Sequence, residues 1–268
     1  MRAIGIDFIS VFGLAPAEFV KLAADLGCQH ISIAPAPFTA NPHNYPLWSL
    51  REDKTLRHEL ASSLRNNNIT ISLGEGFLLR PGTDISAALS DMDLLQELGA
   101  PIVNIVCLES DHSRAIAELA SFAELAGARG MKATLEMMPG LPLGNLAQAA
   151  AAINETGSKN LGLLLDSMHI FRSGATVADI AALDPATIFY AQLCDVPLVS
   201  KYPSYGEEAR DNRLPPGEGE LPLAEFIAAL PPDLMLGLEI PMLAAAQSGH
   251  GPRERLAPCV GATRALIA

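Results

Sequence analysis

The chain has 268 residues, of which 49% are hydrophobic, and its formal net charge is −12 at pH 7. This length and apolar content suffice for one large folded domain or two small ones, and they argue against disorder. Binding to a nucleic-acid backbone requires a positively charged surface, which a chain of this acidic composition does not favour. We therefore expect no nucleic-acid partner.

No apolar run reaches the roughly 18 residues that a membrane span needs. The first residues, MRAIGIDF, also lack the apolar stretch and cleavage site of a signal peptide. We therefore expect a cytoplasmic protein without a membrane partner. The four cysteines form no C-x-x-C pair and lie in apolar surroundings, so we expect reduced core thiols: Cys28, Cys107, Cys194 and Cys259.

Short apolar runs alternate with amphipathic stretches along the chain, which indicates strands that are each followed by a helix. Several runs are almost continuously apolar, as is typical of parallel strands that are covered on both faces. The predicted strands are 3–8, 30–35, 69–76, 101–107, 132–138, 161–166, 188–195 and 234–240. The predicted helices are 15–27, 84–99, 111–130, 142–157, 221–230 and 252–268.

Eight strand and helix units in one series predict an α/β fold, a (β/α)8 TIM barrel that forms a single domain over residues 1–268. The main alternative is a doubly wound open sheet, which usually carries a Gly-rich phosphate loop after its first strand. Here DFISVFGLAPAEF follows the first strand and contains no G-x-G-x-x-G sequence, which favours the barrel. Two long connections, 36–48 and 195–220, lie on the side where barrel active sites form.

Polar side chains end or interrupt the predicted strands, at the barrel face where active sites form. They are Asp7, Glu75, Glu136, Asp166, Gln192 and Glu239. Each of them alone could cap a helix or pair with an arginine. The last four belong to strands five to eight, which are neighbours around the barrel, and this register indicates a shared site.

Three carboxylates that converge in this way repel one another unless a cation lies between them or one takes up a proton. Glu136, Asp166, Gln192 and Glu239 supply four oxygen ligands, a hard set that favours Mg²⁺, Mn²⁺ or Co²⁺, with Zn²⁺ as a further candidate. His169 follows Asp166 by three residues and could be a ligand, a substrate contact or a structural histidine. Beside a metal we expect it to contact substrate.

The sequence resembles the xylose isomerase-like TIM barrel family, also called the AP endonuclease 2 superfamily. This family includes sugar epimerases, inosose isomerases and dehydratases, 3-dehydroshikimate dehydratases and apurinic-site endonucleases. The resemblance covers nearly the whole chain and is carried by LEMMPG, LLLDSMH, QLCD, RLPPGEGELPL and GLEIP.

The epimerases of this family bind one divalent metal through Glu, Asp, His and Glu on strands five to eight. The resemblance therefore implies that Glu136, Asp166 and Glu239 are metal ligands. Gln192 stands where those enzymes have histidine, so a neutral amide oxygen replaces an imidazole, and Asp195 is a candidate for a supporting role behind the ligands. The endonucleases carry further histidines, and this chain has Arg213 at one of those positions, so DNA repair is not expected.

The implied activity is an isomerase or epimerase in carbohydrate metabolism. Its substrate would be a keto-sugar, an inosose or a related hydroxy-keto compound, and it would react through a metal-stabilised enediolate. Glu136 and Glu239 would form the acid–base pair on opposite sides of the reacting carbon. Substrate oxygens would be held by His169 and Arg213, with Arg210 as the rival of Arg213.

Glu75 could act as a further acid, as a hydrogen-bond acceptor or as a helix cap. The main alternative activity is that of a dehydratase, in which the same enediolate expels a β-hydroxyl group. A non-catalytic barrel is the least expected, because the strand-end carboxylates are present. The family often forms dimers or tetramers, so a homo-oligomer is compatible with the resemblance.

Overall fold

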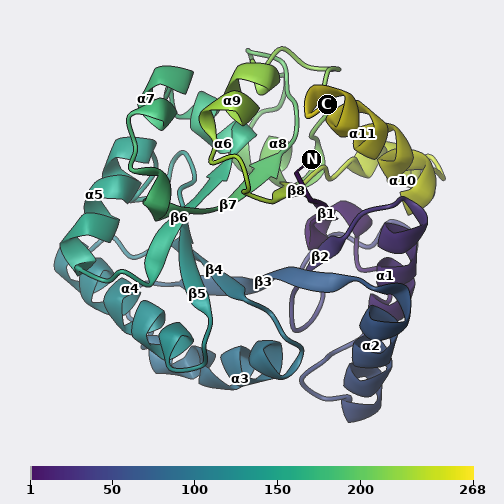
Figure 1. The fold of residues 1–268 in the computed structure, drawn as a ribbon, viewed down its shortest axis with the longest axis horizontal. Helices are drawn as coiled ribbons and strands as arrows, with labels where there is room; N and C mark the ends of the chain where they lie inside the picture. The colour runs from purple at the N-terminus through teal and green to yellow at the C-terminus, as the bar shows by residue number, and fades with distance from the viewer. Residues whose placement is uncertain (1) are drawn as a thin grey trace.

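Eight parallel strands pair in sequence order, and the last pairs with the first to close a barrel. The structure is a computed structural model that describes residues 2–268. It confirms the predicted (β/α)8 barrel, whose helices surround the strands (Figure 1). The strands are β1 (Ile4–Ile6), β2 (His30–Ile33), β3 (Thr70–Leu79), β4 (Ile102–Cys107), β5 (Lys132–Glu136), β6 (Leu161–Asp166), β7 (Ile188–Leu193) and β8 (Leu236–Leu238).

The helices form the outer layer. Their bounds are α1 (Pro16–Asp25), α2 (Lys54–Asn67), α3 (Leu89–Glu97), α4 (His112–Gly127), α5 (Leu146–Thr156), α6 (Ser167–Arg172), α7 (Val177–Ala181), α8 (Tyr205–Asp211), α9 (Leu223–Ala229), α10 (Leu243–Gln247) and α11 (Pro252–Leu266). Three 3₁₀ turns complete the set: η1 (Phe8–Val11), η2 (Ile85–Ala88) and η3 (Pro185–Thr187). No helix within residues 2–268 is both long and apolar enough to cross a membrane.

Five helices were not predicted from the sequence: α2, α6, α7, α8 and α10. Helices α6, α7 and α10 have only five or six residues each, too few for apolar periodicity to reveal them. Helix α2 escapes a search for apolar periodicity because only Leu60 and Leu64 of its 14 residues are buried. Helix α8 lies inside the long connection 195–220, where we expected a loop. The four cysteines are free and buried, as predicted.

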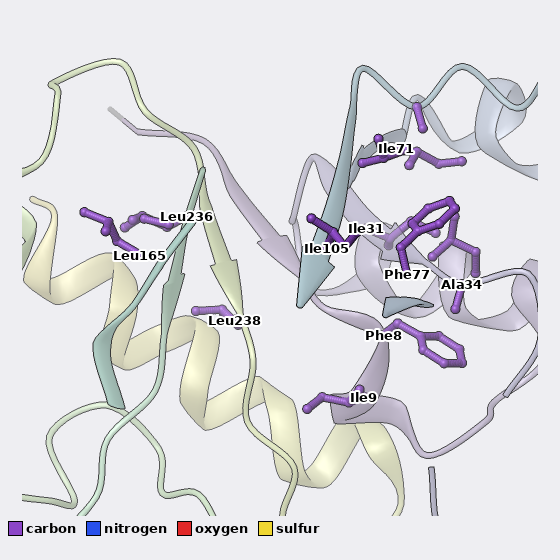
Figure 2. Close-up of a cluster of buried hydrophobic side chains, with 14 of the residues drawn as sticks. Phe8, Ile9, Ile31, Ala34, Ile71, Phe77, Ile105, Leu165, Leu236 and Leu238 are labelled. Carbon is purple, nitrogen blue, oxygen red and sulfur yellow. The ribbon is translucent and has the colours of Figure 1, made fainter. Parts of the chain in front are cut away.

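The largest apolar cluster lies between the barrel and the helices that cover it. Figure 2 shows part of this cluster, with Ile31, Ile71 and Ile105 from three successive strands. Burial of each such side chain contributes roughly 1.5–3 kcal/mol to folding. This layer fixes the strands, and through them the side chains that point into the barrel.

The interior of the barrel has an apolar floor and a polar layer above it. Leu73, Leu164 and Tyr190 form the separate buried cluster at the floor. Because side chains on one face of a strand recur every two residues, Asp166 lies above Leu164 and Gln192 lies above Tyr190. The period of two therefore directs these polar residues toward the inside.

Gly237 of β8 leaves room for the Asp7 carboxylate to pack directly against the backbone of this strand. A Cβ atom at this position would lie 2.2 Å from Asp7 Oδ2. The Asp7 side chain extends from the end of β1 over β8 to Tyr190 of β7, whose hydroxyl donates to Asp7 Oδ1 at 3.0 Å. The Tyr190 hydroxyl also lies 3.1 Å from Ser72 Oγ.

We predict that Gly237→Ala lowers the free energy of unfolding by about 1–3 kcal/mol, because the added methyl group must displace the buried Asp7 carboxylate. Urea denaturation measures this change. Gly261→Ala is the control, because Gly261 is exposed in α11 with open space around it. It should raise stability by about 0.5–1 kcal/mol. A Gly237→Ala protein as stable as the wild type would contradict this packing of Asp7 against Gly237.

Candidate active site

A cavity of about 770 Å³ opens at the carboxyl ends of the strands. Six of the eight site residues predicted from the sequence line it: Glu75, Glu136, His169, Arg210, Arg213 and Glu239. The other two, Asp166 and Gln192, are buried beside it and are register partners on β6 and β7. The fold therefore brings the predicted residues to one place.

The Arg213 guanidinium joins two of the expected metal ligands. Its Nη1 atom lies 2.5 Å from Asp166 Oδ2 and 2.7 Å from Glu239 Oε2. Arg213 Nε donates to the carbonyl of Ala209 at 2.7 Å, and the side chain is buried. Arg213 was expected to hold substrate oxygens, and in the structure its Nη1 atom contacts Asp166 and Glu239.

Burial and this guanidinium set the proton affinities of the pair. Burial alone would raise the pKa of Asp166, but the charge of Arg213, followed by that of His169, holds it below its usual value. Burial raises the pKa of Glu239 well above its usual range, and the neighbouring carboxylates Glu136 and Asp166 add to this rise against the effect of Arg213. The two carboxyl groups are therefore unequal in acidity.

Glu136 is held by two side chains. Asn104 Nδ2 donates to Glu136 Oε2 at 2.6 Å, and His169 Nε2 lies 3.2 Å from Glu136 Oε1. Thr134 donates to Asn104 Oδ1 at 2.9 Å, which orients the asparagine amide. Asn104 was not predicted to belong to the site, although a polar residue in the middle of the apolar strand PIVNIVC was a usable signal.

His169 is buried at the start of α6. Its backbone N–H donates to Asp166 Oδ1 at 2.9 Å, so that Asp166 caps this helix. The imidazole Nδ1 forms a hydrogen bond with the hydroxyl of Tyr205, at the start of α8. The long connection thus contributes Tyr205 to the site, a residue that the sequence pattern did not identify.

Asp195 was a candidate for a supporting role behind the metal ligands, but in the structure it contacts the backbone of its own loop. Its carboxylate accepts hydrogen bonds from the backbone N–H groups of Val196 at 2.9 Å, Gly217 at 2.9 Å and Leu221 at 3.1 Å. These bonds fasten the two ends of the connection 195–220. Asp195 therefore braces the loop that carries Tyr205 and Arg210.

The donor atoms of the site fit a divalent cation. Gln192 Nε2 donates to Glu239 Oε1 at 3.0 Å, which leaves Gln192 Oε1 buried without a hydrogen-bond partner. Buried carbonyl oxygens normally have a partner, and a cation would provide one. With a cation bound, the carboxylates of Glu136, Asp166 and Glu239 would together carry three negative charges against the one positive charge of Arg213, which would leave two for the cation to balance. Oxygen donors of this kind suit hard divalent ions.

The ligands are not gathered around a common point. Within residues 2–268 the structure holds no group of three or more His, Cys, Asp or Glu side chains arranged to hold an ion. Asp166 and Glu239 both contact the Arg213 guanidinium instead. A cation that binds all four predicted ligands would have to compete with Arg213 for these two carboxylates.

A closed barrel with carboxylates at the ends of its late strands defines a class of (β/α)8 proteins with a polar strand-end site. A family model described as xylose isomerase-like TIM barrel matches residues 20–253. The chain belongs to this family.

Comparisons with individual proteins give relatives of two named activities. The chain is 31% identical over 156 residues to a 3-dehydroshikimate dehydratase of Pseudomonas aeruginosa, a match that covers 56% of this chain and 24% of that protein. It is 27% identical over 114 residues to an inosose isomerase of Halalkalibacterium halodurans, which covers 42% of this chain and 39% of that protein. The chain thus spans less than half the length of either relative.

A solved structure shows the same fold. It is described as the IOLI protein with a binding zinc atom, and it superposes with a TM-score of 0.82 over 99% of this chain and 98% of that one. The sequence identity is 18%, so this likeness concerns the fold.

We predict that Gln192→His tightens the binding of Mn²⁺ or Co²⁺ at least roughly tenfold, the scale at which metal sites respond even to changes beside the ligands. Imidazole is a stronger ligand for these ions than a neutral amide oxygen. Isothermal titration calorimetry on metal-free protein measures the Kd. Gln148→His, on the exposed side of α5, is the control and should leave the Kd unchanged. An unchanged Kd in Gln192→His would remove Gln192 from the ligand set.

Proposed function

We propose that this protein is an enzyme that removes a proton next to a carbonyl group of a small polyhydroxylated keto compound. The support is geometric. Glu136 and Glu239, from opposite ends of the series β5 to β8, both line one cavity, and His169 lies between Glu136 and the loop residue Tyr205. Carboxylates placed on a substrate cavity are suited to proton transfer at carbon.

Glu136, Asp166, Gln192 and Glu239 would hold a divalent cation, which when bound polarises the substrate carbonyl and stabilises the enolate charge. Glu136 takes the proton through Oε1, because Oε2 is bonded to Asn104. The nearby His169 Nε2 stabilises the carboxylate charge. Asn104 fixes the direction of the carboxyl group, so the base does not have to be ordered during the reaction.

Within this class we propose dehydration of a cyclic hydroxy-keto acid. The observation that carries this choice is a pair of arginines on the same cavity, Arg80 and Arg210. Both are exposed, and among residues 2–268 neither forms an ion pair with an acidic side chain. Two cations with no acidic partner on the cavity of a protein of net charge −12 suit a substrate carboxylate.

The Pseudomonas aeruginosa relative supports the same choice. It is named as a dehydratase of 3-dehydroshikimate, a ring compound that carries a ketone, hydroxyl groups and a carboxylate. From the sequence, isomerisation is the first candidate and dehydration the alternative, and the two cannot be separated because they share the base and the enolate. The arginine pair and this relative both support dehydration over isomerisation.

Isomerisation or epimerisation of a keto-sugar or inosose is the second candidate. The inosose isomerase relative favours it, and so does the presence of both Glu136 and Glu239 on the cavity, since one carboxyl group could remove a proton and the other return it. A neutral polyol, however, has no negative charge to pair with Arg80 and Arg210.

We predict that the protein, supplied with Mg²⁺, Mn²⁺ or Co²⁺, converts 3-dehydroshikimate to a conjugated product with loss of one water, which ultraviolet absorbance and mass spectrometry measure. Inososes and ketoses in D₂O form the comparison panel. Glu136→Gln should reduce the rate by about 10²–10⁴-fold, as expected for loss of a general base, while Glu124→Gln on the exposed side of α4 should not. If no compound in the panel loses water, isomerises or exchanges its proton with any metal, the proposed function is wrong.

We predict that Arg80→Ala and Arg210→Ala each raise KM for the acid about tenfold, with a smaller change in kcat, because hydrogen bonds to charged groups contribute roughly 1.5–3 kcal/mol. Steady-state kinetics measure both constants. Arg65→Ala, on the exposed side of α2, is the control. The methyl ester of the acid should be bound equally by the wild type and the two variants. Unchanged KM values for the acid would instead favour a neutral substrate.

A further inference from the structure

Glu75 lies on the opposite side of the cavity from strands β5 to β8. It has no role in the proposed function so far. It belongs to β3, in a stretch where the pairing with β4 shifts register between Gly74 and Phe77. Such a bulge redirects a side chain, and the next residue, Gly76, has φ of +100°, a conformation that favours glycine. The bulge places a carboxyl group, only 7% exposed, on the cavity wall.

The hydrogen-bond donors around Glu75 fix where its proton can be. The backbone N–H of Phe8 donates to Ser32 Oγ at 2.7 Å, so the one hydroxyl hydrogen of Ser32 is free to be donated elsewhere. Ser32 donates it to Glu75 Oε1. With Ser32 as the donor to Oε1, a neutral Glu75 carries its acidic proton on Oε2, the oxygen that remains for a ligand in the cavity.

The surroundings favour this neutral form. Burial, followed by the negative charge of Asp7, raises the pKa of Glu75 to about 8. Ser32 opposes the rise, and Glu136 adds to it. Glu75 therefore differs from Asp166, whose pKa is held low by Arg213. The cavity thus has an acid on the wall formed by β3, whereas the carboxylate of Asp166 at the end of β6 is buried beside the cavity.

We propose that Glu75 is the general acid that gives its Oε2 proton to the leaving β-hydroxyl group during dehydration. This role rests on the proposed function and goes beyond it, because it assigns the step that separates a dehydratase from an isomerase. Glu136 removes the proton from the carbon next to the carbonyl, and the C–H electron pair forms the enolate. The enolate electrons then form the carbon–carbon double bond, the C–O bond breaks toward the hydroxyl, and the Glu75 proton completes water. Solvent returns one proton to Glu75 and accepts one from Glu136.

The test is Glu75→Gln, which retains an acceptor for Ser32 and a donor at the Oε2 position but has no proton to transfer. In D₂O with 3-dehydroshikimate as the probe, we expect water loss to fall at least about hundredfold, while exchange of the proton next to the carbonyl continues. The β-fluoro analogue is the second probe, because fluoride leaves without protonation. Glu75→Gln should release fluoride at a rate close to that of the wild type. Circular dichroism checks the fold.

The outcomes separate this role from the function on which it rests. Retained exchange with lost dehydration, and fluoride release close to the wild-type rate, support Glu75 as the acid. Wild-type dehydration by Glu75→Gln, or loss of exchange and fluoride release together, overturns the role of Glu75 alone. A wild-type protein that neither exchanges nor eliminates overturns the proposed function and this role with it.

A second variant covers the case in which Glu75→Gln does not fold. Ser32→Ala removes the donor that fixes the proton on Oε2, so dehydration should slow while exchange stays unchanged. Equal effects on both processes would overturn the role.

Discussion

The site depends on one constraint: several carboxyl groups are buried at the same end of a closed barrel, with the buried guanidinium of Arg213 among them. Asp166 and Glu239 contact the same Nη1 atom of this guanidinium, at 2.5 Å and 2.7 Å. Buried charges of like sign raise one another's pKa unless a positive charge or a hydrogen-bond donor compensates. Each of the other polar contacts in the site can be understood as a response to this constraint.

The carboxyl groups meet the constraint in different ways. Asp166 stays acidic because Arg213 and His169 are beside it. Glu136 accepts a hydrogen bond from Asn104 and lies close to His169. Asp7 and Glu75 have hydroxyl donors instead, from Tyr190 and Ser32, and burial raises the pKa of Asp7 to about 7 and that of Glu75 to about 8. One barrel thus holds ionised and neutral carboxyl groups side by side, which is the arrangement that acid–base chemistry requires.

The sequence predicted the barrel and the positions of the strand-end residues, because both follow from local patterns. Apolar runs of strand length define the order of elements, and the period of two directs Asp166 and Gln192 inward. The partners of these residues could not be predicted in the same way. Arg213 is 47 residues from Asp166 and 26 from Glu239 along the chain, and only the folded path of the connection 195–220 brings them together.

The same reason explains the residues that were misplaced or missed. Asp195 was expected near the metal ligands because of its position after β7, but the backbone N–H groups of its own loop use its oxygens. Tyr205 lies in a short helix that the sequence pattern did not separate from the loop. Asn104 had a local signal, whereas its contact with Glu136 depends on the pairing of β4 with β5.

We propose above all that a strand-end carboxylate of this barrel removes a proton next to a carbonyl group. The most direct test uses 3-dehydroshikimate with deuterium on the carbon from which Glu136 is proposed to take the proton. Mass spectrometry of the recovered substrate then follows the label, because an aromatic product would lose this hydrogen by any route. We expect the wild type to pass the label to solvent during turnover and Glu136→Gln to leave it in the recovered substrate. Loss of the label at the wild-type rate in Glu136→Gln would contradict this role of Glu136.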